Sequence, residues 1–535
     1  MSTVTSRLAG FRELHRLAWR RDRIIVPASI LGLVLLSVGS AQATLALYPD
    51  QQSAVEGLAG IVSNPAVLAM YGPINAANAD ALAVFKTVMM GSVLIAILAL
   101  VVVRRHTRTE EEEGRLELVG AGAVGRWAPL AAAITLALVA VVVPAVLSTA
   151  GLAALGMDPL GSVAFGVSWL TAGLAQIGVT AVAVQLAATT RGAGGLAFGF
   201  LGVSYILRAW ADASDSDVIA SLGWLSPLGW AGRVEPYGED RLWVLLLGVA
   251  MLVVGTGAAL TILERRDLGA GVLPGRVGRS RARAILSSPM GLVTRLATGT
   301  LVGWVVGLVA GGVVIGSLLG AVGTLVDDPT MRDFLAQLGG SAGTVEAIFL
   351  ATETKFIAAA VSAAGIALVL RLGASERSGL GESVLATPTP RREWYGAHVL
   401  IGVAATSLFM TVAGLTVGIV GPMSSAGAPE LGATLGAFLS TLPAIWLLVG
   451  TAALLVGWRP RFAPFVWAVL LVGFVIGELG PTLQLPDWVV DLSPFAHLSQ
   501  LPGGEFAAVA AVVMTALAGA FVAAGAMAYQ QRDVA

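Results

Sequence analysis

EEGRLELVGAGAVGR at Glu112–Arg126 and RSGLGESVLATPTPR at Arg377–Arg391 are two related polar segments, each placed between long apolar runs. The second follows the first by 265 positions, and four residues recur in register: Gly114 with Gly379, Glu117 with Glu382, Val119 with Val384, and Arg126 with Arg391. Apolar runs built from a few residue types match by chance, so polar loops are the informative part of this comparison. Their recurrence indicates a tandem duplication.

Apolar residues dominate the rest of the chain. Of its 535 residues, 56% are hydrophobic and 12% are charged, and the mean hydropathy is +0.84. Many apolar runs approach the ~20 residues that cross a bilayer as a helix, which predicts an all-α polytopic membrane protein. About twelve transmembrane helices are expected, at Ile24–Leu47, Leu82–Val103, Trp127–Leu152, Val163–Ala188, Gly194–Trp210, Leu242–Ile262, Gly299–Gly323, Ala347–Leu370, Gly396–Val420, Thr434–Val456, Phe465–Leu479 and Phe506–Tyr529.

Two further loop pairs recur at nearly the same spacing. LSPLGW at Leu225–Trp230 matches LSPFAH at Leu492–His497, and ERRDLG from Glu264 matches QQRDVA from Gln530. An even number of spans in each half gives both halves the same orientation, as parallel repeats about an axis along the membrane normal. We expect a first six-helix half at residues 1–263, a Gly- and Arg-rich cytoplasmic linker at 264–284, and a second six-helix half at 285–535.

The two sets of loops differ in charge. One set carries most of the arginines, at positions 7–23, 104–126, 191, 265–283, 377–392, 459–461 and 532, whereas acidic residues outnumber arginines in the other. Positive charge is retained on the cytoplasmic side, so both termini and the Glu-rich loop are predicted to be cytoplasmic. The N-terminal arginines, an apolar run and AQA at Ala41–Ala43 also resemble a cleavable signal peptide, but the apolar run continues through Leu47 and cleavage is not expected.

Composition argues against several classes of function. Cysteine is absent and the four histidines are far apart, so no metal site is expected. A net charge of −1 gives no basic surface for nucleic acid. Neither of the two lysines, Lys86 and Lys355, follows the glycine-rich loop that a P-loop requires. We therefore expect no cofactor and no enzymatic activity on this chain, and an ATP-driven function requires ATP and Mg²⁺ on a separate protein. The spans contain no GxSxG elbow and no carboxylate dyad, so the sequence does not predict a membrane enzyme.

Both polar segments follow the pattern E-x-x-G-x-x-E-x-[VL]-x-A-x-x-x-x-R. This pattern resembles the coupling helix of ABC-2-type permeases, the membrane subunits of type V-like ABC exporters. With two copies and LSPLGW in the last outer loop of the first half, the whole chain is similar to the fused twelve-helix actinobacterial exporters of polyketide antibiotics, the tetronasin type. The resemblance implies two parallel six-helix repeats that export hydrophobic drugs or polyketide antibiotics across the cell membrane. It also implies two copies of a separate ATPase as partners, beside membrane lipid and a hydrophobic substrate.

In that family, a short helix of the first intracellular loop inserts into a cleft of the ATPase. The matching helices are expected at Glu110–Val119 and Ser375–Leu385, with Glu110–Glu113 in a first helical turn, where negative charge is favourable. The ATPase-docking residues are then Glu111, Glu113, Gly114, Glu117, Arg126, Glu376, Gly379, Glu382 and Arg391. The second copy is less acidic, which predicts unequal docking sites, and a solvated charged loop is the alternative for both. Phe11–Arg21 and Leu286–Ala297 occupy the place of the family's interfacial helices.

Few ionisable residues lie within the predicted spans. Lys86, Glu353 and Lys355 are candidates for a polar gate in the transport pathway, and the alternatives are snorkelling or structural pairing, including Lys86 with Asp80 or Glu353. Arg208 and Glu478 lie near the outer ends of two spans and form either an ion pair or two separate snorkelling residues. A proton-coupled multidrug transporter, the alternative function, would have Glu353 and Glu478 as proton sites, and both lie off-centre.

Two segments are expected to form short re-entrant hairpins at the outer surface, Asp212–Arg241 and Gly480–Glu505. Each contains aromatic residues suited to the membrane interface and prolines that interrupt regular backbone. The residues concerned are Trp224, Pro227, Trp230, Trp488 and Pro494. A cap over the pathway and a simple aromatic belt are both open readings of these residues.

Overall fold

The computed structural model describes residues 7–48, 65–74, 76–120, 122–214, 216–273, 284–324, 345–479, 486–499 and 501–532. Within these residues every regular element is a helix, and twelve helices are long and apolar enough to cross a membrane. The all-α fold class with twelve spans is therefore confirmed. The chain divides into two compact units, unit 1 (Met1–Gly278) and unit 2 (Arg279–Ala535).

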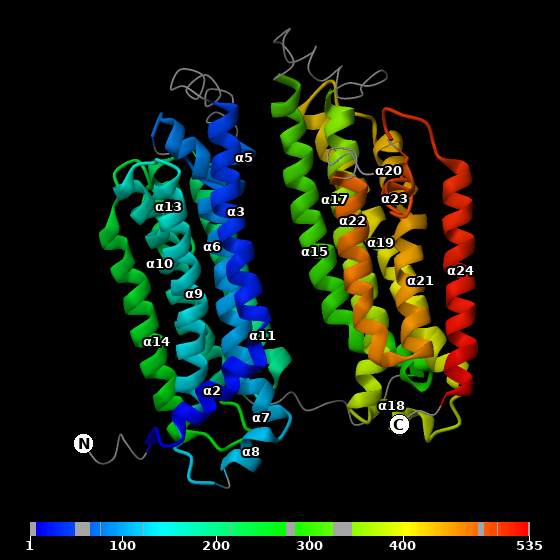
Figure 1. Cartoon of the computed structure of the whole chain (residues 1–535), viewed down its shortest axis with the longest axis horizontal. Helices are drawn as coiled ribbons and strands as arrows, with labels where there is room; N and C mark the ends of the chain where they lie inside the picture. The colour runs from blue at the N-terminus through cyan, green and yellow to red at the C-terminus, as the bar shows by residue number, and fades with distance from the viewer. Residues whose placement is uncertain are drawn as a thin grey trace. The chain divides into compact units, whose positions relative to one another are not determined.

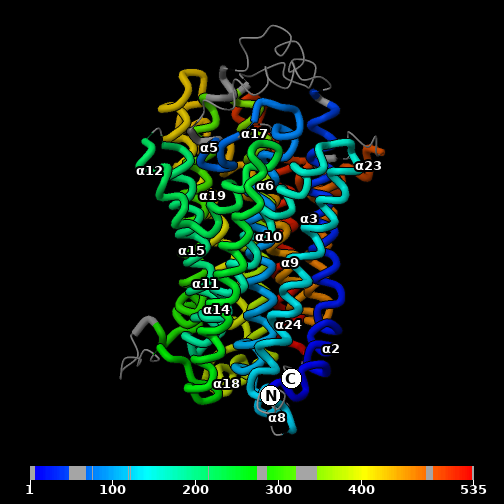
Figure 2. Tube along the Cα trace, turned by 90° about the vertical axis from the view of Figure 1, so that its left-hand side faces the viewer, coloured from blue at the N-terminus to red at the C-terminus, as the bar shows by residue number. Residues whose placement is uncertain are grey.

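Unit 1 is built around a buried central helix. Its long helices are α3 (Ile25–Leu47), α6 (Ala79–Arg104), α9 (Ala128–Ala154), α10 (Pro159–Leu186), α11 (Thr190–Asp212) and α14 (Leu245–Arg265). α10 is the most buried of them and packs against α6, α9, α11 and α14. The short helices α2 (Phe11–Asp22), α7 (Glu110–Glu112) and α8 (Arg115–Gly120) lie at one end of the unit, and α5 (Pro65–Tyr71), α12 (Asp217–Leu222) and α13 (Gly229–Arg233) lie at the other (Figure 1, Figure 2).

Unit 2 also contains six spans. They are α15 (Pro289–Thr324), α17 (Val345–Arg377), α19 (Arg391–Ser424), α20 and α21 (Leu431–Ser440 and Leu442–Trp458), α22 (Val466–Leu479) and α24 (Ala508–Gln531). The helix breaks at Thr441 between α20 and α21, because Pro443 supplies no backbone N–H at the start of α21. The short helices α18 (Leu380–Leu385) and α23 (Asp487–Val490) lie at opposite ends of unit 2 (Figure 1).

The same helix pairs are in contact in the two units. In unit 1, the first long helix packs against the second and third, and the fourth packs against the second, third, fifth and sixth. In unit 2, α15 packs against α17 and α19, and α21 packs against α17, α19, α22 and α24. Each unit therefore has its fourth span at the centre of the same set of neighbours.

Helix starts at both ends of unit 1 are fixed by local side-chain caps. Asn78 accepts a hydrogen bond from Ala81 N at 2.7 Å at the start of α6, and Asp158 accepts one from Gly161 N at 2.8 Å at the start of α10. Thr189 caps α11 in the same way, through Gly192 N at 3.0 Å. These side chains satisfy backbone donors that have no partner within the first helical turn.

Small residues bring α10 and α14 into close contact. A Cβ atom at Gly255 would lie 2.6 Å from the backbone of Gly178, and one at Gly248 would lie 2.7 Å from Thr171 O. Because both residue numbers rise together, α10 and α14 run parallel. Small residues at one face allow this backbone approach, which in a bilayer replaces the hydrophobic effect as the source of helix association. α21 and α24 make the equivalent approach through Gly450 and Ala518.

One of the two predicted interfacial helices is present and the other is not. The interfacial helix predicted at Phe11–Arg21 is present as α2, but Leu286–Ala297 is not a separate helix, because a short turn at Ala284–Ser287 leads directly into the long helix α15. The first part of the predicted linker also packs on unit 1. Val272 N and Leu273 N donate to the carbonyl oxygens of Gln185 and Leu186, at 3.4 and 2.9 Å.

Candidate functional site

The Glu-rich loop of unit 1 is the end of a membrane helix followed by a glycine break. α6 passes through a π-helical turn at Arg105–Thr109 into α7, so one continuous helix ends at Glu112. Gly114 follows with φ +73°, a conformation that glycine adopts at little cost, and α8 begins at Arg115. The single helix predicted over Glu110–Val119 is therefore wrong.

The sequence also placed Glu110–Glu113 in a first helical turn, and that expectation is wrong. They lie at the C-terminal end of a long helix, where the helix dipole disfavours negative charge. Contacts with other elements compensate for this position.

Unit 2 has the same arrangement at the corresponding positions. α17 ends at Arg377, Gly379 has φ +75°, and the six-residue helix α18 begins at Leu380. The helix predicted over Ser375–Leu385 is thus divided in the same way. A long helix, a left-handed glycine and a short helix therefore occur once in each unit.

Glu110 joins α7 to α2. It is largely buried and lies 2.5 Å from the guanidinium of Arg21, near the end of α2. Arg115 in α8 donates two hydrogen bonds to its carboxylate, at 2.7 and 2.9 Å. The bond to Glu110 is the main cause that raises the pKa of the Arg115 guanidinium above its usual value. One carboxylate therefore connects three short elements at this end of unit 1.

Glu111 joins α7 to the residues that follow α14. Arg266 forms a bidentate pair with its carboxylate, at 2.6 and 2.8 Å, and Gly269 N donates a further hydrogen bond at 2.6 Å. The guanidinium of Arg108 lies 3.0 Å away. All three charged side chains are at most 7% exposed. Glu111 is therefore part of a buried ion-pair cluster.

Glu112 makes contact with a third element. Its carboxylate accepts a hydrogen bond from Thr190 N, the first residue of α11, at 2.6 Å. An anion at this position satisfies a free backbone donor at the positive end of α11. Three consecutive glutamates thus bind to three different elements, which explains why the acidic residues are adjacent in the sequence.

A second buried cluster of charged side chains joins the end of α2 to the π-helical turn that follows α6. Asp22, the last residue of α2, is 1% exposed and lies 2.7 Å from Nε2 of His106 and 3.1 Å from the guanidinium of Arg105. Sequence reasoning did not assign Asp22 or His106 to the site. The sequence shows a charged residue at the end of an amphipathic helix, but it does not show which residue pairs with it.

In unit 2 one ion pair corresponds to the Glu111–Arg266 pair of unit 1, and each of these two pairs is called an anchor below. Glu376 binds Arg532 with distances of 2.6 and 2.8 Å, and Arg532 follows α24 as Arg266 follows α14. Arg126 donates to the carbonyl oxygen of Arg266, and Arg391 donates to that of Arg532 at 2.7 Å. The contacts Glu111–Arg266 and Arg126–Arg266 of unit 1 are therefore reproduced in unit 2.

The exposed part of each segment is the short helix that follows the glycine. Glu117 and Leu118 in α8 are exposed, Leu118 by 79%, and Glu113 forms a surface ion pair with Arg115. In α18, Glu382 is exposed while Glu376 is buried. Among the predicted docking residues, the two clearly exposed acidic positions shared by both units are thus Glu117 and Glu382.

At the opposite end of unit 1, Arg208 is fully buried and does not snorkel. It donates to the carbonyl oxygens of Ala69 and Met70 in α5, at 2.6 and 3.1 Å, and lies 3.3 Å from Asp212. Its partner is therefore within its own helix, four residues on. The side chain of Glu478 lies outside the described residues, so its role stays a prediction.

The predicted outer hairpins contain short helices, and their serines tie them to the preceding span. Ser226 of LSPLGW donates to Ser204 O in α11 at 2.7 Å, and Ser493 of LSPFAH donates to Gly473 O in α22 at 2.6 Å. The predicted aromatic and proline residues differ in exposure. Trp224 stacks on Trp243 and accepts a hydrogen bond from Trp230 at its carbonyl, Pro227 is buried, Pro494 is half-buried, and Trp488 is 69% exposed.

The three candidates for a polar gate lie in the second span of each unit. Lys86 is exposed on α6, with its ammonium 5.5 Å from the ring centroid of Phe85. Asp80, one proposed partner of Lys86, accepts a hydrogen bond from Asp158 N at 3.0 Å. Glu353 and Lys355 are half-buried on α17. A gating role for these residues stays a prediction.

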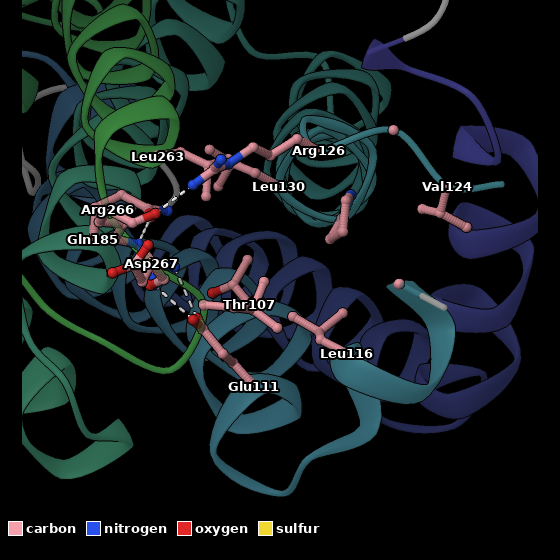
Figure 3. Close-up of a pocket in the computed structure, with 14 residues that line it drawn as sticks. Thr107, Glu111, Leu116, Val124, Arg126, Leu130, Gln185, Leu263, Arg266 and Asp267 are labelled. Carbon is pink, nitrogen blue, oxygen red and sulfur yellow. Dashed lines mark hydrogen bonds and ion pairs between the residues drawn. The ribbon is translucent and has the colours of Figure 1, made fainter. Parts of the chain in front are cut away.

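A cavity of about 330 Å³ lies beside the Glu111–Arg266 pair in unit 1. Figure 3 shows that its walls come from several elements, with Leu116 of α8 on one side and Leu263 and Arg266 on another. Arg126 and Leu130 complete the wall from the start of α9. The short helix and the ends of several spans, α9, α10 and α14 among them, therefore meet around one cavity.

Comparison with known proteins identifies the family of this chain. The family model for the C-terminal domain of the multidrug efflux system permease Rv1217c matches residues 286–530. The multidrug efflux system permease protein Rv1217c of Mycobacterium tuberculosis (strain ATCC 25618 / H37Rv) is 37% identical over 536 residues, which cover 99% of this chain and 96% of the relative. With its twelve candidate spans, this chain is a multi-pass membrane protein that belongs to the family of multidrug efflux permeases typified by Rv1217c.

Proposed function

We propose that this chain is the transmembrane subunit of an ATP-driven ABC exporter that moves hydrophobic drugs or polyketide antibiotics out across the cytoplasmic membrane. A separate ATPase dimer, which carries ATP and Mg²⁺, docks on α8 and α18. Both termini and both short helices are then cytoplasmic, in agreement with the distribution of arginines. The 37% identical relative is a multidrug efflux permease, which supports the type of cargo.

The observation that carries this proposal is the anchored short helix present once in each unit. In both units a glutamate–arginine pair, buried in unit 1 and partly buried in unit 2, ties the end of the second span to the residue after the sixth. A left-handed glycine then separates this pair from a short helix that carries one exposed glutamate, Glu117 in α8 and Glu382 in α18. Two such helices suit two copies of a partner with basic surfaces, because complementary charge guides association.

The ion pairs also support a mechanism for coupling. A force on α8 reaches Arg115 and Glu110, and from α7 it passes to α2, α14 and α11 through Arg21, Arg266 and Thr190. Unit 2 has the Glu376–Arg532 connection at the corresponding position, while Ser375 and Ser378 replace two of the glutamates. We therefore propose that the two docking sites are unequal and that unit 1 transmits motion to more helices.

Co-purification with a candidate ABC ATPase, sought first in the adjacent reading frames, tests the proposal. Charge reversal at the exposed residues (Glu113→Lys with Glu117→Lys, and separately Glu382→Lys) is expected to weaken the complex and its drug-stimulated ATP hydrolysis. Glu430→Lys and Glu505→Lys are matched controls, since these exposed glutamates lie at the end of unit 2 far from α18.

Transport by reconstituted vesicles separates this function from the alternative. Vesicles that contain both proteins are expected to accumulate drug only with ATP. Uphill transport by this chain alone, driven by a pH difference, would show a proton-coupled transporter and contradict the proposal.

A further inference from the structure

The cavity of unit 1 has the size and lining of a small-molecule site. Its volume of about 330 Å³ lies at the lower end of the ~300–1,000 Å³ that is usual for ligand pockets. Leucines form much of the wall, namely Leu116, Leu130, Leu263 and Leu268, and charged side chains lie among them (Figure 3). An apolar body with one polar group would satisfy such a lining.

Large aromatic side chains occupy the corresponding positions of unit 2. The offset of 265 that aligns the two polar segments pairs Leu130 with Tyr395, and the offset of 266 that aligns Arg266 with Arg532 pairs Leu263 with Tyr529. Both tyrosines are at most 2% exposed, and their ring centroids are 5.5 Å apart. Pro129, another residue of the cavity wall, corresponds to the fully buried Trp394. At the sequence positions that correspond to Pro129, Leu130 and Leu263 of the cavity wall, unit 2 therefore has buried aromatic side chains.

Two acidic and two basic residues line the cavity, and Arg126 is the basic one that is not held in an ion pair with any described residue. Glu111 and Arg266 at the wall are committed to each other by their bidentate pair. Asp267 and Arg126 at the wall balance each other. Arg126 uses one amino group to reach the carbonyl of Arg266, and its guanidinium has five N–H donors. Its other donors are available to a ligand carboxylate.

We propose that this cavity binds an amphipathic organic carboxylate, with the apolar body among the leucines and the carboxylate at Arg126. The site is specific to unit 1, because aromatic rings take its place in unit 2. A bound molecule would contact α8 and the ends of α9, α10 and α14, because residues of all four helices line the cavity. The inference goes beyond the proposed function and does not depend on ATPase docking.

Photolabelling of the purified full-length chain, without ATPase, tests the site. The probe is decanoic acid that bears a diazirine, added to the protein in phosphatidylcholine nanodiscs. Adducts are expected in the peptides 107–130 and 263–268, and unlabelled decanoate is expected to compete. The amide of the same probe should label these peptides about tenfold less, because it lacks the charge-assisted hydrogen bond. Equal labelling by the amide would overturn the proposal.

Cavity filling provides a variant that the chain itself suggests. Leu130→Tyr combined with Leu263→Tyr places the residues of unit 2 in unit 1 and is expected to lower labelling about tenfold. Leu147→Tyr with Leu246→Tyr is the matched control, since it makes the same substitutions in α9 and α14 at exposed positions. Unchanged labelling of the filled variant would refute the site.

Two further measurements keep the test independent of folding. Arg126→Gln is expected to weaken labelling by the carboxylate about tenfold, and Arg126→Lys, which keeps the charge, to restore most of it. A monodisperse size-exclusion profile is required of each variant. Loss of labelling in phosphatidylglycerol nanodiscs would assign the cavity to a lipid headgroup and overturn the carboxylate proposal.

Discussion

Replacement of Glu111 by glutamine tests whether this residue is an anchor or a surface for docking. The change keeps the size of the side chain but removes the charge that pairs with Arg266 and Arg108. The side chains of these two arginines are 7% and 1% exposed, so they would be left buried without a carboxylate. Removing one partner of a buried ion pair costs about 3–5 kcal/mol. We expect a loss of stability in this range for Glu111→Gln.

Glu376→Gln in unit 2 provides the internal comparison. Glu376 pairs with one arginine, Arg532, whose side chain is 17% exposed and can recover part of its hydration. We expect a smaller loss, about 1–3 kcal/mol. Glu117→Gln should leave stability within about 0.5 kcal/mol, because Glu117 is an exposed surface residue.

Thermal unfolding in detergent, followed by size-exclusion chromatography, measures the order of these variants. Membrane proteins often unfold irreversibly, so the apparent midpoints should be compared at one heating rate. The expected order of destabilisation is Glu111→Gln, then Glu376→Gln, then Glu117→Gln. A midpoint for Glu111→Gln equal to that of the unmodified protein would refute the anchoring role. Equal destabilisation by Glu117→Gln and Glu111→Gln would also refute the anchoring role of Glu111.

Three other perturbations follow from the structure. Gly114→Ala should cost about 1–2 kcal/mol, because it places a Cβ in a left-handed conformation, and co-purification with the ATPase should fall. Gly255→Leu should lower the yield of folded protein by pushing α14 from α10, whereas Gly257→Leu on the same helix meets open space and should not. Lys86→Ala and Lys355→Ala should lower drug export if these residues form a gate, and unchanged export and ATPase stimulation would remove that role.

The sequence predicts the fold well because a bilayer imposes one length scale on every span. Each predicted run coincides with a helix long and apolar enough to cross, including the shorter ones at Gly194–Trp210 and Phe465–Leu479. Helix ends are less predictable. The bilayer does not dictate where a helix stops in water, so α6 continues through a π-helical turn to Glu112 and α15 begins already at Pro289.

The site is less predictable because its partners are far apart in the sequence. Four consecutive glutamates look equivalent in the sequence, but Glu111 faces Arg266, 155 positions away, while Glu113 is exposed. Helical periodicity alone does not show which carboxylate is buried, because that depends on where the neighbouring helices lie. One signal was available: ERRDLG and QQRDVA place Arg266 and Arg532 at equivalent positions, and both prove to bind a glutamate.

The two units differ in the contacts around the end of their second span. At the end of its second span, unit 1 has a carboxylate for each of three neighbouring elements and a cavity beside them, whereas the described residues at the corresponding positions of unit 2 form the Glu376–Arg532 pair and a pair of buried tyrosines. Packed rings resist rearrangement because protein interiors are close-packed and a shift of one side chain displaces its neighbours. Ion pairs at the ends of helices instead link elements that can still tilt. Under the proposed function, unit 1 is therefore the unit in which docking moves helices, and its cavity is the place where a small molecule can oppose that movement.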